Sequence, residues 1–177
     1  MTLSARSRGP RRLALLTLPI ALAWLATPAA LALDEGDRAP AFAAPSLDGK
    51  GTVELSRYRG KVVYLDFWAS WCAPCLVAIP EIERMRSEFP ADQFQVIAVN
   101  LDQKEKKALR FLAKNPVGYP SASDPEGSLP ERYGVDTMPT SYLIDRDGVI
   151  RYVHRGFQRG DSDKLRREIR ALIGAKR

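Results

Sequence analysis

The chain has 177 residues, of which 45% are hydrophobic and 27% are charged. This is the length of one folded domain with a short extension, and the ordinary apolar fraction argues against an intrinsically disordered chain. Two cysteines and one histidine are too few for a four-ligand structural zinc site or a disulfide-stapled miniprotein.

The net charge of +6 is concentrated at the N-terminus. Residues 1–32 contain four arginines and no acidic residue, which leaves a net charge of only +2 on the other 145 residues. A nucleic-acid-binding domain carries a basic patch on its folded surface. The charge distribution therefore argues against binding to nucleic acid.

Residues 1–32 have the three parts of a secretory signal peptide. Arginines precede an uncharged run from Leu13 to Leu33, and Pro28 stands shortly before the small-residue sequence Ala30-Leu31-Ala32. We expect cleavage after Ala32. The run is also long enough to span a bilayer, so an uncleaved membrane anchor is the alternative. In both cases residues 33–177 form the folded domain, outside the cytoplasm.

Predicted strands and helices alternate along this domain. In chain order they are a short edge strand over 52–55, a buried strand over 61–68, a helix over 72–89, a second buried strand over 93–100, a helix over 103–114, a turn region over 124–133, strands over 140–144 and 149–153, and a helix over 161–173. Nearly continuous apolar runs indicate strands that are buried on both faces. This order predicts an α/β fold with helices on both faces of a central sheet.

Three details of these elements can be checked in a structure. Pro80 lies inside a predicted helix and should kink it. Leu109 and Leu112 should face inward from the next helix, because its lysines occupy the other positions. Asp147-Gly148 between two strands is a strong hairpin signal.

The two cysteines form a Cys72-Ala73-Pro74-Cys75 motif between a buried strand and a helix. At a helix N-terminus, unpaired backbone N–H groups and the helix dipole stabilise a thiolate. Cys75 is one turn further on, where it can attack a mixed disulfide formed at Cys72. Pro74 suits the first helical turn. An inert structural disulfide is the alternative, but so short a ring constrains the unfolded chain very little.

The domain resembles the thioredoxin-like superfamily, and within it the exported TlpA/ResA-like branch of thiol–disulfide oxidoreductases. The matching segments are the active-site run Leu65–Cys75, the helix proline Pro80, the cis-proline loop Met138-Pro139-Thr140, and the branch-specific runs 58–61 and 142–148. Over residues 36–173, the resemblance implies a thioredoxin-like fold with a central mixed β-sheet flanked by helices on both faces.

The resemblance also implies roles for individual residues. Cys72 would attack a substrate disulfide and Cys75 would resolve the resulting mixed disulfide. Pro139 would be cis and would place the backbone of Met138 to pair with an extended substrate segment. The substrate would also contact Trp71 and Pro74, although Trp71 could be a plain surface aromatic and Pro139 an ordinary turn proline.

Asp66 interrupts the buried strand and matches the buried acid of thioredoxin, which relays a proton to the second cysteine. Burial raises the pKa of a carboxyl group and lets it exchange protons near neutrality. Many TlpA/ResA-like proteins have Asn at this position and Glu three residues after the second cysteine, whereas this chain has Asp66 and Ala78. We therefore expect thioredoxin-like proton transfer through Asp66, with a satisfied structural acid as the alternative.

The sequence thus predicts a periplasmic oxidoreductase that reduces protein disulfides and needs neither metal nor other cofactor. The expected substrates are of the cytochrome c maturation or copper-centre assembly type. A membrane-embedded thiol-reductant donor would regenerate the dithiol, because the periplasm is kept oxidising. We expect a monomer that contacts the membrane only through an N-terminal anchor, if that segment is retained.

Two other functions are weighed against this prediction. A thiol peroxidase is the first, because the run 58–62 is also similar to the lead-in of peroxiredoxins. A copper-binding assembly module is the second, with His154 as a ligand in addition to the two cysteines. We expect His154 to be a surface residue, because the cysteine spacing does not support copper binding.

Overall fold

The structure is a computed structural model that describes residues 32–175. The predicted signal peptide or anchor lies outside the described residues, apart from Ala32, and so remains a prediction. No helix within residues 32–175 is both long and apolar enough to cross a membrane.

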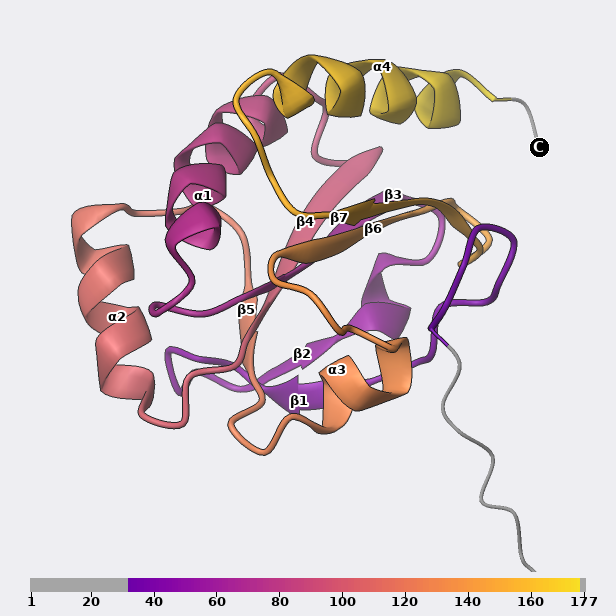
Figure 1. Ribbon diagram of the computed structural model, residues 1–177. Coiled ribbons are helices and arrows are strands. Elements are labelled where there is room, and N and C mark those ends of the chain that lie inside the picture. The colour runs from indigo at the N-terminus through magenta and orange to yellow at the C-terminus, as the bar shows by residue number, and fades with distance from the viewer. Residues whose placement is uncertain (1–31, 176–177) are drawn as a thin grey trace, which may run out of the picture.

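A five-stranded mixed sheet with the order β5-β4-β3-β6-β7 forms the centre of the domain (Figure 1). Its strands are β3 (Val62–Trp68), β4 (Phe94–Asn100), β5 (Ser121–Ser123), β6 (Thr140–Ile144) and β7 (Ile150–Arg155). The strand β3 pairs in parallel with β4 and antiparallel with β6. All seven residues of β3 are buried, as its continuous apolar sequence predicts.

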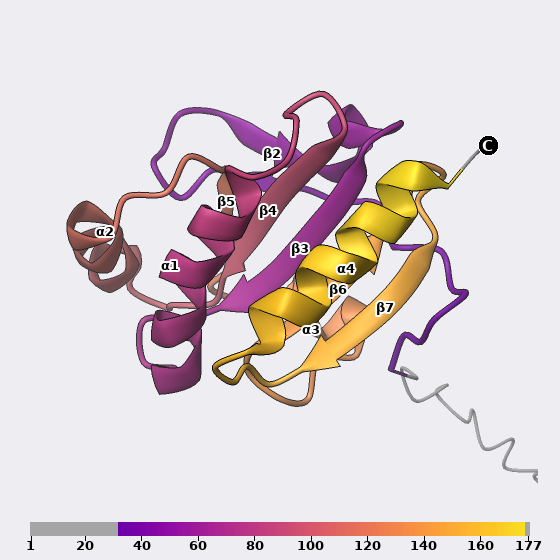
Figure 2. The same ribbon diagram turned by 90° about the horizontal axis from the view of Figure 1, so that it is seen from above.

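Helices cover both faces of the sheet, which confirms the predicted α/β class. They are α1 (Ala73–Arg86), α2 (Glu105–Lys114), α3 (Ser128–Tyr133) and α4 (Asp161–Gly174). Figure 2 shows α1 and α4 lying over the same face of the sheet. On the opposite face lie α3 and a separate two-stranded sheet made of β1 (Ala43–Pro45) and β2 (Thr52–Glu54), which is followed by a short 3₁₀ helix, η1 (Leu55–Tyr58).

Side chains of β3 alternate between two hydrophobic cores. Tyr64 and Trp68 belong to the core that also contains Cys75, beneath α1 and α4. Leu65 and Phe67 belong to the core on the α3 side. Because successive side chains of a strand point to opposite faces, Asp66 projects to the same side as Tyr64 and Trp68.

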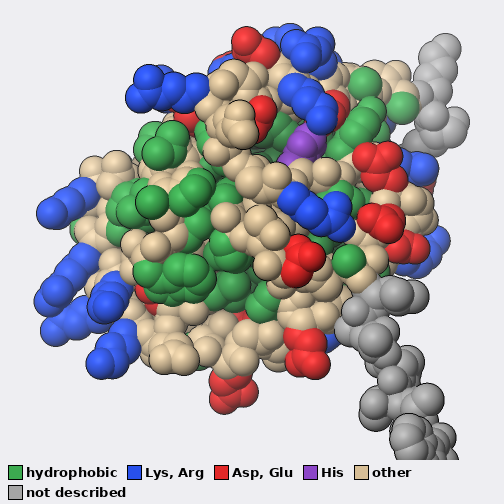
Figure 3. Space-filling view, in the orientation of Figure 1, with side chains coloured by type: hydrophobic (Ala, Val, Ile, Leu, Met, Phe, Trp, Pro, Cys, Tyr) green, Lys and Arg blue, Asp and Glu red, His purple; other side chains and the backbone are tan. Residues whose placement is uncertain are grey.

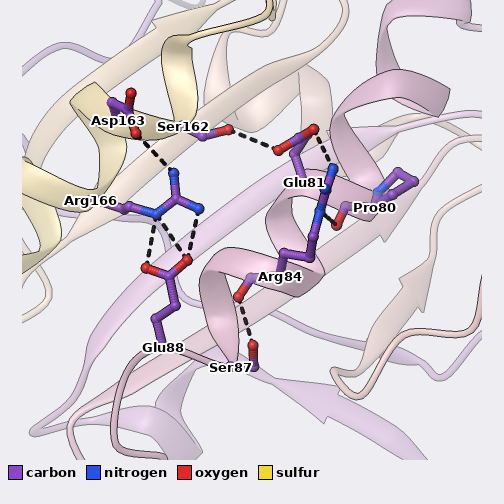
Figure 4. A network of polar contacts seen from close by, with 8 residues as sticks. All are labelled: Pro80, Glu81, Arg84, Ser87, Glu88, Ser162, Asp163 and Arg166. Atoms are coloured by element: carbon purple, nitrogen blue, oxygen red, sulfur yellow. Dashed lines mark hydrogen bonds and ion pairs between the residues drawn. The ribbon is translucent and has the colours of Figure 1, made fainter.

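Polar contacts join α4 to α1 and to the turn that follows α1, at the surface of the first core (Figure 4). The guanidinium of Arg166 donates hydrogen bonds to both carboxylate oxygens of Glu88, at 2.7 to 3.0 Å. Near the start of α4, the Ser162 hydroxyl lies 3.4 Å from a carboxylate oxygen of Glu81. These contacts bridge residues about 80 positions apart and fix how α4 lies against α1.

Several predicted boundaries differ from the structure. The helix after the cysteine motif ends at Arg86 rather than Phe89, because the chain tightens there into hydrogen bonds between residues three apart. Pro80 lies inside this helix, as expected, and the kink expected at Pro80 stays a prediction. The next helix begins at Glu105 instead of Gln103. The strands β1 (Ala-Ala-Pro) and β5 (Ser-Ala-Ser) were not predicted, because neither contains a β-branched or aromatic residue that would indicate a strand.

The expected inward orientation of Leu109 is wrong. Leu109 is 40% exposed, whereas Ala108 is fully buried. Phe111 and Leu112 pack against the same core as Ala108. Each residue turns a helix by about 100°, so Leu109 is carried out of the buried face that begins at Ala108. Leu109 was predicted to face inward because leucine is larger and more hydrophobic than the neighbouring Ala108, which is the residue that is buried.

Candidate active site

The two cysteines lie where β3 ends and α1 begins, and they form a disulfide bond. Cys72 caps the N-terminus of α1, and its Sγ accepts a hydrogen bond from the backbone N–H of Cys75 at 3.3 Å. Cys72 retains 5% of its accessible surface, whereas Cys75 retains none. The first cysteine is therefore the one that a partner molecule can approach, with helix N–H groups available to stabilise its thiolate.

The surroundings of Cys72 are exposed and apolar. Trp71 is 64% exposed and Val77 is 50% exposed, and Pro74 is also exposed. Trp68, by contrast, is buried in the core and its indole N–H faces the Ser121 hydroxyl at 3.3 Å. Figure 3 shows hydrophobic side chains gathered over the region where α1 begins. Such a patch beside a reactive group is typical of a protein-interaction surface.

The predicted cis-proline loop precedes β6. The Met138–Pro139 peptide bond is cis, as the resemblance implies. Pro139 is buried, and Met138 is half-buried and packs against the core cluster that contains both cysteines. The carbonyl oxygen of Pro139 accepts a hydrogen bond from the Gly156 N–H at 2.7 Å, which ties the loop to the end of β7.

Asp66 is 2% exposed, on the side of the sheet that faces α1. Burial raises the pKa of its carboxyl group to about 8. A carboxyl with such a pKa can both accept and donate a proton near neutrality. The side chain lies in the same layer as Cys75 and is thus placed on the correct side of the sheet to serve the buried cysteine.

A second buried carboxylate, Asp102, was missed by the sequence analysis. It accepts hydrogen bonds from the Ser70 backbone N–H at 2.8 Å, from the Ser70 hydroxyl at 2.6 Å and from the Asn100 side-chain amide at 2.9 Å. These contacts fix the loop that leads into Cys72. Asp102 follows the end of β4, and β4 pairs in parallel with β3. Because the carboxyl ends of parallel strands lie side by side, an acidic residue directly after β4 could have been expected near the residues that follow β3.

His154 lies at the surface, as expected, but it is half-buried there rather than freely exposed. Its side chain is only 16% exposed, and its Nε2 lies 2.8 Å from a carboxylate oxygen of Glu168 on α4. Among residues 32–175 there is no cluster of three or more His, Cys, Asp or Glu side chains that could hold a metal ion. His154 is instead part of the interface between β7 and α4.

Comparisons with known proteins agree with this geometry. The model of the Redoxin family matches residues 34–169. The chain is 33% identical over 118 residues to the thiol-disulfide oxidoreductase ResA of Bacillus thuringiensis subsp. konkukian, which covers 67% of this chain and 68% of the relative. It is 35% identical over 127 residues to the thioredoxin-like protein YneN of Bacillus subtilis, covering 70% and 73% of the two chains.

A solved structure is similar over nearly the whole described domain. It is a crystal structure from Chlorobium tepidum, assigned to the thiol:disulfide interchange protein DsbE. The TM-score is 0.77 and the identity 48%, and the match covers 81% of this chain and all of that chain. The mixed sheet and its flanking helices therefore have the thioredoxin-like arrangement.

We predict that Asp66 makes the folded state less stable as the pH rises. Its pKa is about 8 in the folded state against an ordinary 3.8, so between these values the folded state holds a proton that the unfolded state has lost. The free energy of unfolding should fall by up to about 1.4 kcal/mol per pH unit across this window and level off above it. Urea unfolding of the disulfide form from pH 5 to pH 9 measures this slope.

The matched control is Asp66→Asn, which removes the ionisation and nearly preserves the shape. Its unfolding free energy should exceed that of the wild type increasingly from pH 5 to pH 8. Parallel pH profiles for the two proteins would show that Asp66 does not have a raised pKa.

We also predict that Asp102→Ala destabilises the domain by roughly 3 kcal/mol, because it leaves a buried N–H and two polar side chains without their charged acceptor. Urea unfolding measures this loss. The exposed Asp92→Ala is the control and should change stability by less than about 0.5 kcal/mol. Equal denaturation midpoints for the two variants would contradict this role of Asp102.

Proposed function

The chain belongs to the Redoxin family and is a thiol–disulfide oxidoreductase of the ResA/DsbE type in the thioredoxin-like TlpA/ResA branch, and from that premise we propose that it is an exported reductase of protein disulfides. The observation that carries the proposal is the Cys72–Cys75 pair at the start of α1, beside the exposed Trp71. An apolar surface around an approachable sulfur suits a protein substrate better than a small hydrophilic disulfide.

In the first step, the Cys72 thiolate attacks one sulfur of the substrate disulfide. A bond forms between the Cys72 sulfur and that substrate sulfur, and the other substrate sulfur leaves as a thiolate. The N–H groups at the start of α1 favour the thiolate of Cys72 before the attack. The hydrogen bond from the Cys75 N–H to the Cys72 sulfur supports this role.

In the second step, Cys75 resolves the mixed disulfide. Its thiol gives a proton to the Asp66 carboxylate, and its sulfur attacks the Cys72 sulfur. The Cys72–Cys75 bond forms, and the second substrate sulfur leaves as a thiolate. Two electrons pass from the dithiol to the substrate, and both substrate thiolates take protons from water. When a donor reopens the disulfide, the protonated Asp66 returns its proton to Cys75.

The substrate is held beside Cys72 by the exposed surface and by the loop before β6. We assign Trp71 and Pro74 to apolar contact with the substrate, in agreement with their exposure. The Met138 backbone, adjacent to the cis bond to Pro139, pairs with an extended segment of the substrate. Backbone pairing of this kind tolerates many substrate sequences, because the side chains of the substrate do not determine it.

The substrates that we propose are cysteine pairs that must be reduced before they receive haem or copper. Export is supported by the signal-like features of residues 1–32. A membrane-embedded thiol donor must supply electrons outside the cytoplasm, because that compartment does not hold a reducing thiol pool. The protein acts as a monomer. The disulfide within a Cys-x-x-Cys motif favours this function over the peroxidase and copper-binding alternatives.

We predict that Cys75→Ser accumulates a covalent complex with a substrate protein, because attack by Cys72 is retained and resolution is lost. Non-reducing electrophoresis after mixing with an oxidised substrate detects this complex. Cys72→Ser is the matched control and should form none. Equal amounts of complex from the two variants would sink the assignment of attacking and resolving cysteines.

The reduction potential of the Cys72–Cys75 pair tests the direction of the reaction. A reductase supplied from the cytoplasm should have a value near that of thioredoxin, roughly −270 mV. Equilibration with glutathione and dithiothreitol buffers measures it. A value near that of a disulfide donor, roughly −120 mV, would overturn the proposed direction.

A further inference from the structure

An open hollow lies beside the approachable cysteine, between the loop that carries it and the start of α2. Its volume is about 480 Å³. The residues that line it are Trp71, Leu101, Asp102, Gln103, Lys104 and Lys107. Trp71 directly precedes Cys72 in the chain. A molecule that is bonded to the Cys72 sulfur therefore has this hollow within reach.

Direct contacts hold the two walls of the hollow together. The backbone N–H of Leu101 donates a hydrogen bond to the Trp68 carbonyl oxygen at 3.0 Å, and the Asp102 carboxylate accepts hydrogen bonds from Ser70. Behind them, the ring of Phe111 on α2 lies 5.9 Å from the ring of Trp68, between centroids. The start of α2 is thus fixed against the loop that leads into α1, and the hollow is a built part of the fold.

The wall that α2 forms is strongly basic. Five exposed basic side chains lie on this helix or directly before it, namely Lys104, Lys106, Lys107, Arg110 and Lys114. Within residues 32–175, none of the five forms an ion pair. Both arginines of α1, by contrast, are paired with glutamates of the same helix. Figure 3 shows Lys and Arg side chains along the edge of the molecule where α2 lies, beside the hydrophobic patch.

The acidic residues near α2 do not neutralise this wall. The carboxylate of Asp102 is buried, and it accepts three hydrogen bonds from the neighbouring loop and strand. The carboxylate of Glu105 accepts a hydrogen bond from the Ser123 hydroxyl. Lys104 and Lys107 are three residues apart, so they lie on the same side of the chain as it enters the helix. Both line the hollow and give it a positive charge.

We propose that this hollow binds an acidic segment of the substrate protein, next to the cysteine that Cys72 attacks. The inference rests on the proposed reduction of protein disulfides, and it specifies which substrates react fastest. Trp71 packs against carbon atoms of the segment, while Lys104 and Lys107 pair with its carboxylates. An extended chain advances about 3.3 Å per residue, so the hollow spans roughly three residues. The preferred substrate thus carries Asp or Glu within about five residues of its reactive cysteine.

Nucleic acids and anionic membranes are also negatively charged, but the position of the basic wall favours a protein segment. The two lysines share the hollow with Trp71, which stands next to the reactive cysteine. A substrate disulfide has to be at that cysteine for the reaction to occur. Opposite charges on protein and substrate raise the rate of productive encounter by about ten- to a thousandfold, and salt screens the effect.

Three synthetic peptides test this preference. Each contains the same internal disulfide, flanked on both sides by three glutamates, three glutamines or three lysines. The reduced full-length protein passes two electrons to the peptide, whose two sulfurs become thiols, while Cys72 and Cys75 form their disulfide. Acid quenching, thiol alkylation and mass spectrometry measure the rate.

We expect the glutamate peptide to react about tenfold faster than the glutamine peptide at low salt, and the lysine peptide to react more slowly than both. The ratio of the glutamate and glutamine rates should fall below about threefold in roughly 0.5 M salt, where the Debye length is only a few ångströms.

Variants of the two lysines identify the hollow as the source of the preference. Lys104→Gln/Lys107→Gln should bring the ratio of the glutamate and glutamine rates close to one. Lys104→Glu/Lys107→Glu should make the lysine peptide react faster than the glutamate peptide, which a misfolded protein cannot do. Arg57→Gln/Arg167→Gln is the matched control, because it removes the same charge from exposed positions that do not line the hollow. It should keep most of the preference.

The outcomes separate this inference from the function on which it rests. Equal rates for the three peptides, or a wild-type ratio in Lys104→Gln/Lys107→Gln, would overturn the inference and leave the reductase function standing. If no peptide oxidises the reduced protein, the proposed function fails and the inference fails with it. If the rates are equal and phosphatidylglycerol vesicles bind the wild type more tightly than the glutamine variant, the basic wall faces a membrane and the inference is wrong.

Discussion

The junction between β3 and α1 is the constraint on which the site depends. The strand ends at Trp68, deep in the sheet, and the chain has only a few residues in which to emerge and begin a helix whose first N–H groups lack partners. Cys72 stands at that helix terminus, and its sulfur accepts a hydrogen bond from one of those N–H groups, that of Cys75. The network around Asp102 holds the connecting loop, so the position of the sulfur is set by β3, β4 and α1 together.

The buried carboxyl group of Asp66 lowers the stability of the domain next to this junction. Asp66 occupies a position in a fully buried strand where an apolar residue would stabilise the core, and burial of its charged form is costly. The carboxyl avoids this cost at neutral pH by holding its proton, and the same raised pKa lets it exchange a proton with a buried thiol. An isolated ionisable group in an otherwise apolar strand is therefore better explained by chemistry than by folding.

The sequence predicted the features that depend on local pattern. Continuous apolar runs located β3 and β4, and the spacing of Cys72 and Cys75 between a buried strand and a predicted helix located the redox pair. Features set by tertiary neighbours were missed. Asp102 meets Ser70 only because two parallel strands end side by side, and the burial of His154 depends on where α4 crosses β7. Resemblance, rather than residue pattern, was needed to expect a cis bond before Pro139.

Because the side chains of β3 alternate between two cores, the number of residues between Asp66 and Cys72 is constrained. Tyr64 and Trp68 face one core, and Leu65 and Phe67 face the other. Deleting or inserting one residue between Asp66 and Cys72 would either rotate the carboxyl to the α3 side or pull the cysteine away from its helix terminus. Substitutions within this segment should be tolerated in related chains, but insertions and deletions between the acid and the first cysteine should not.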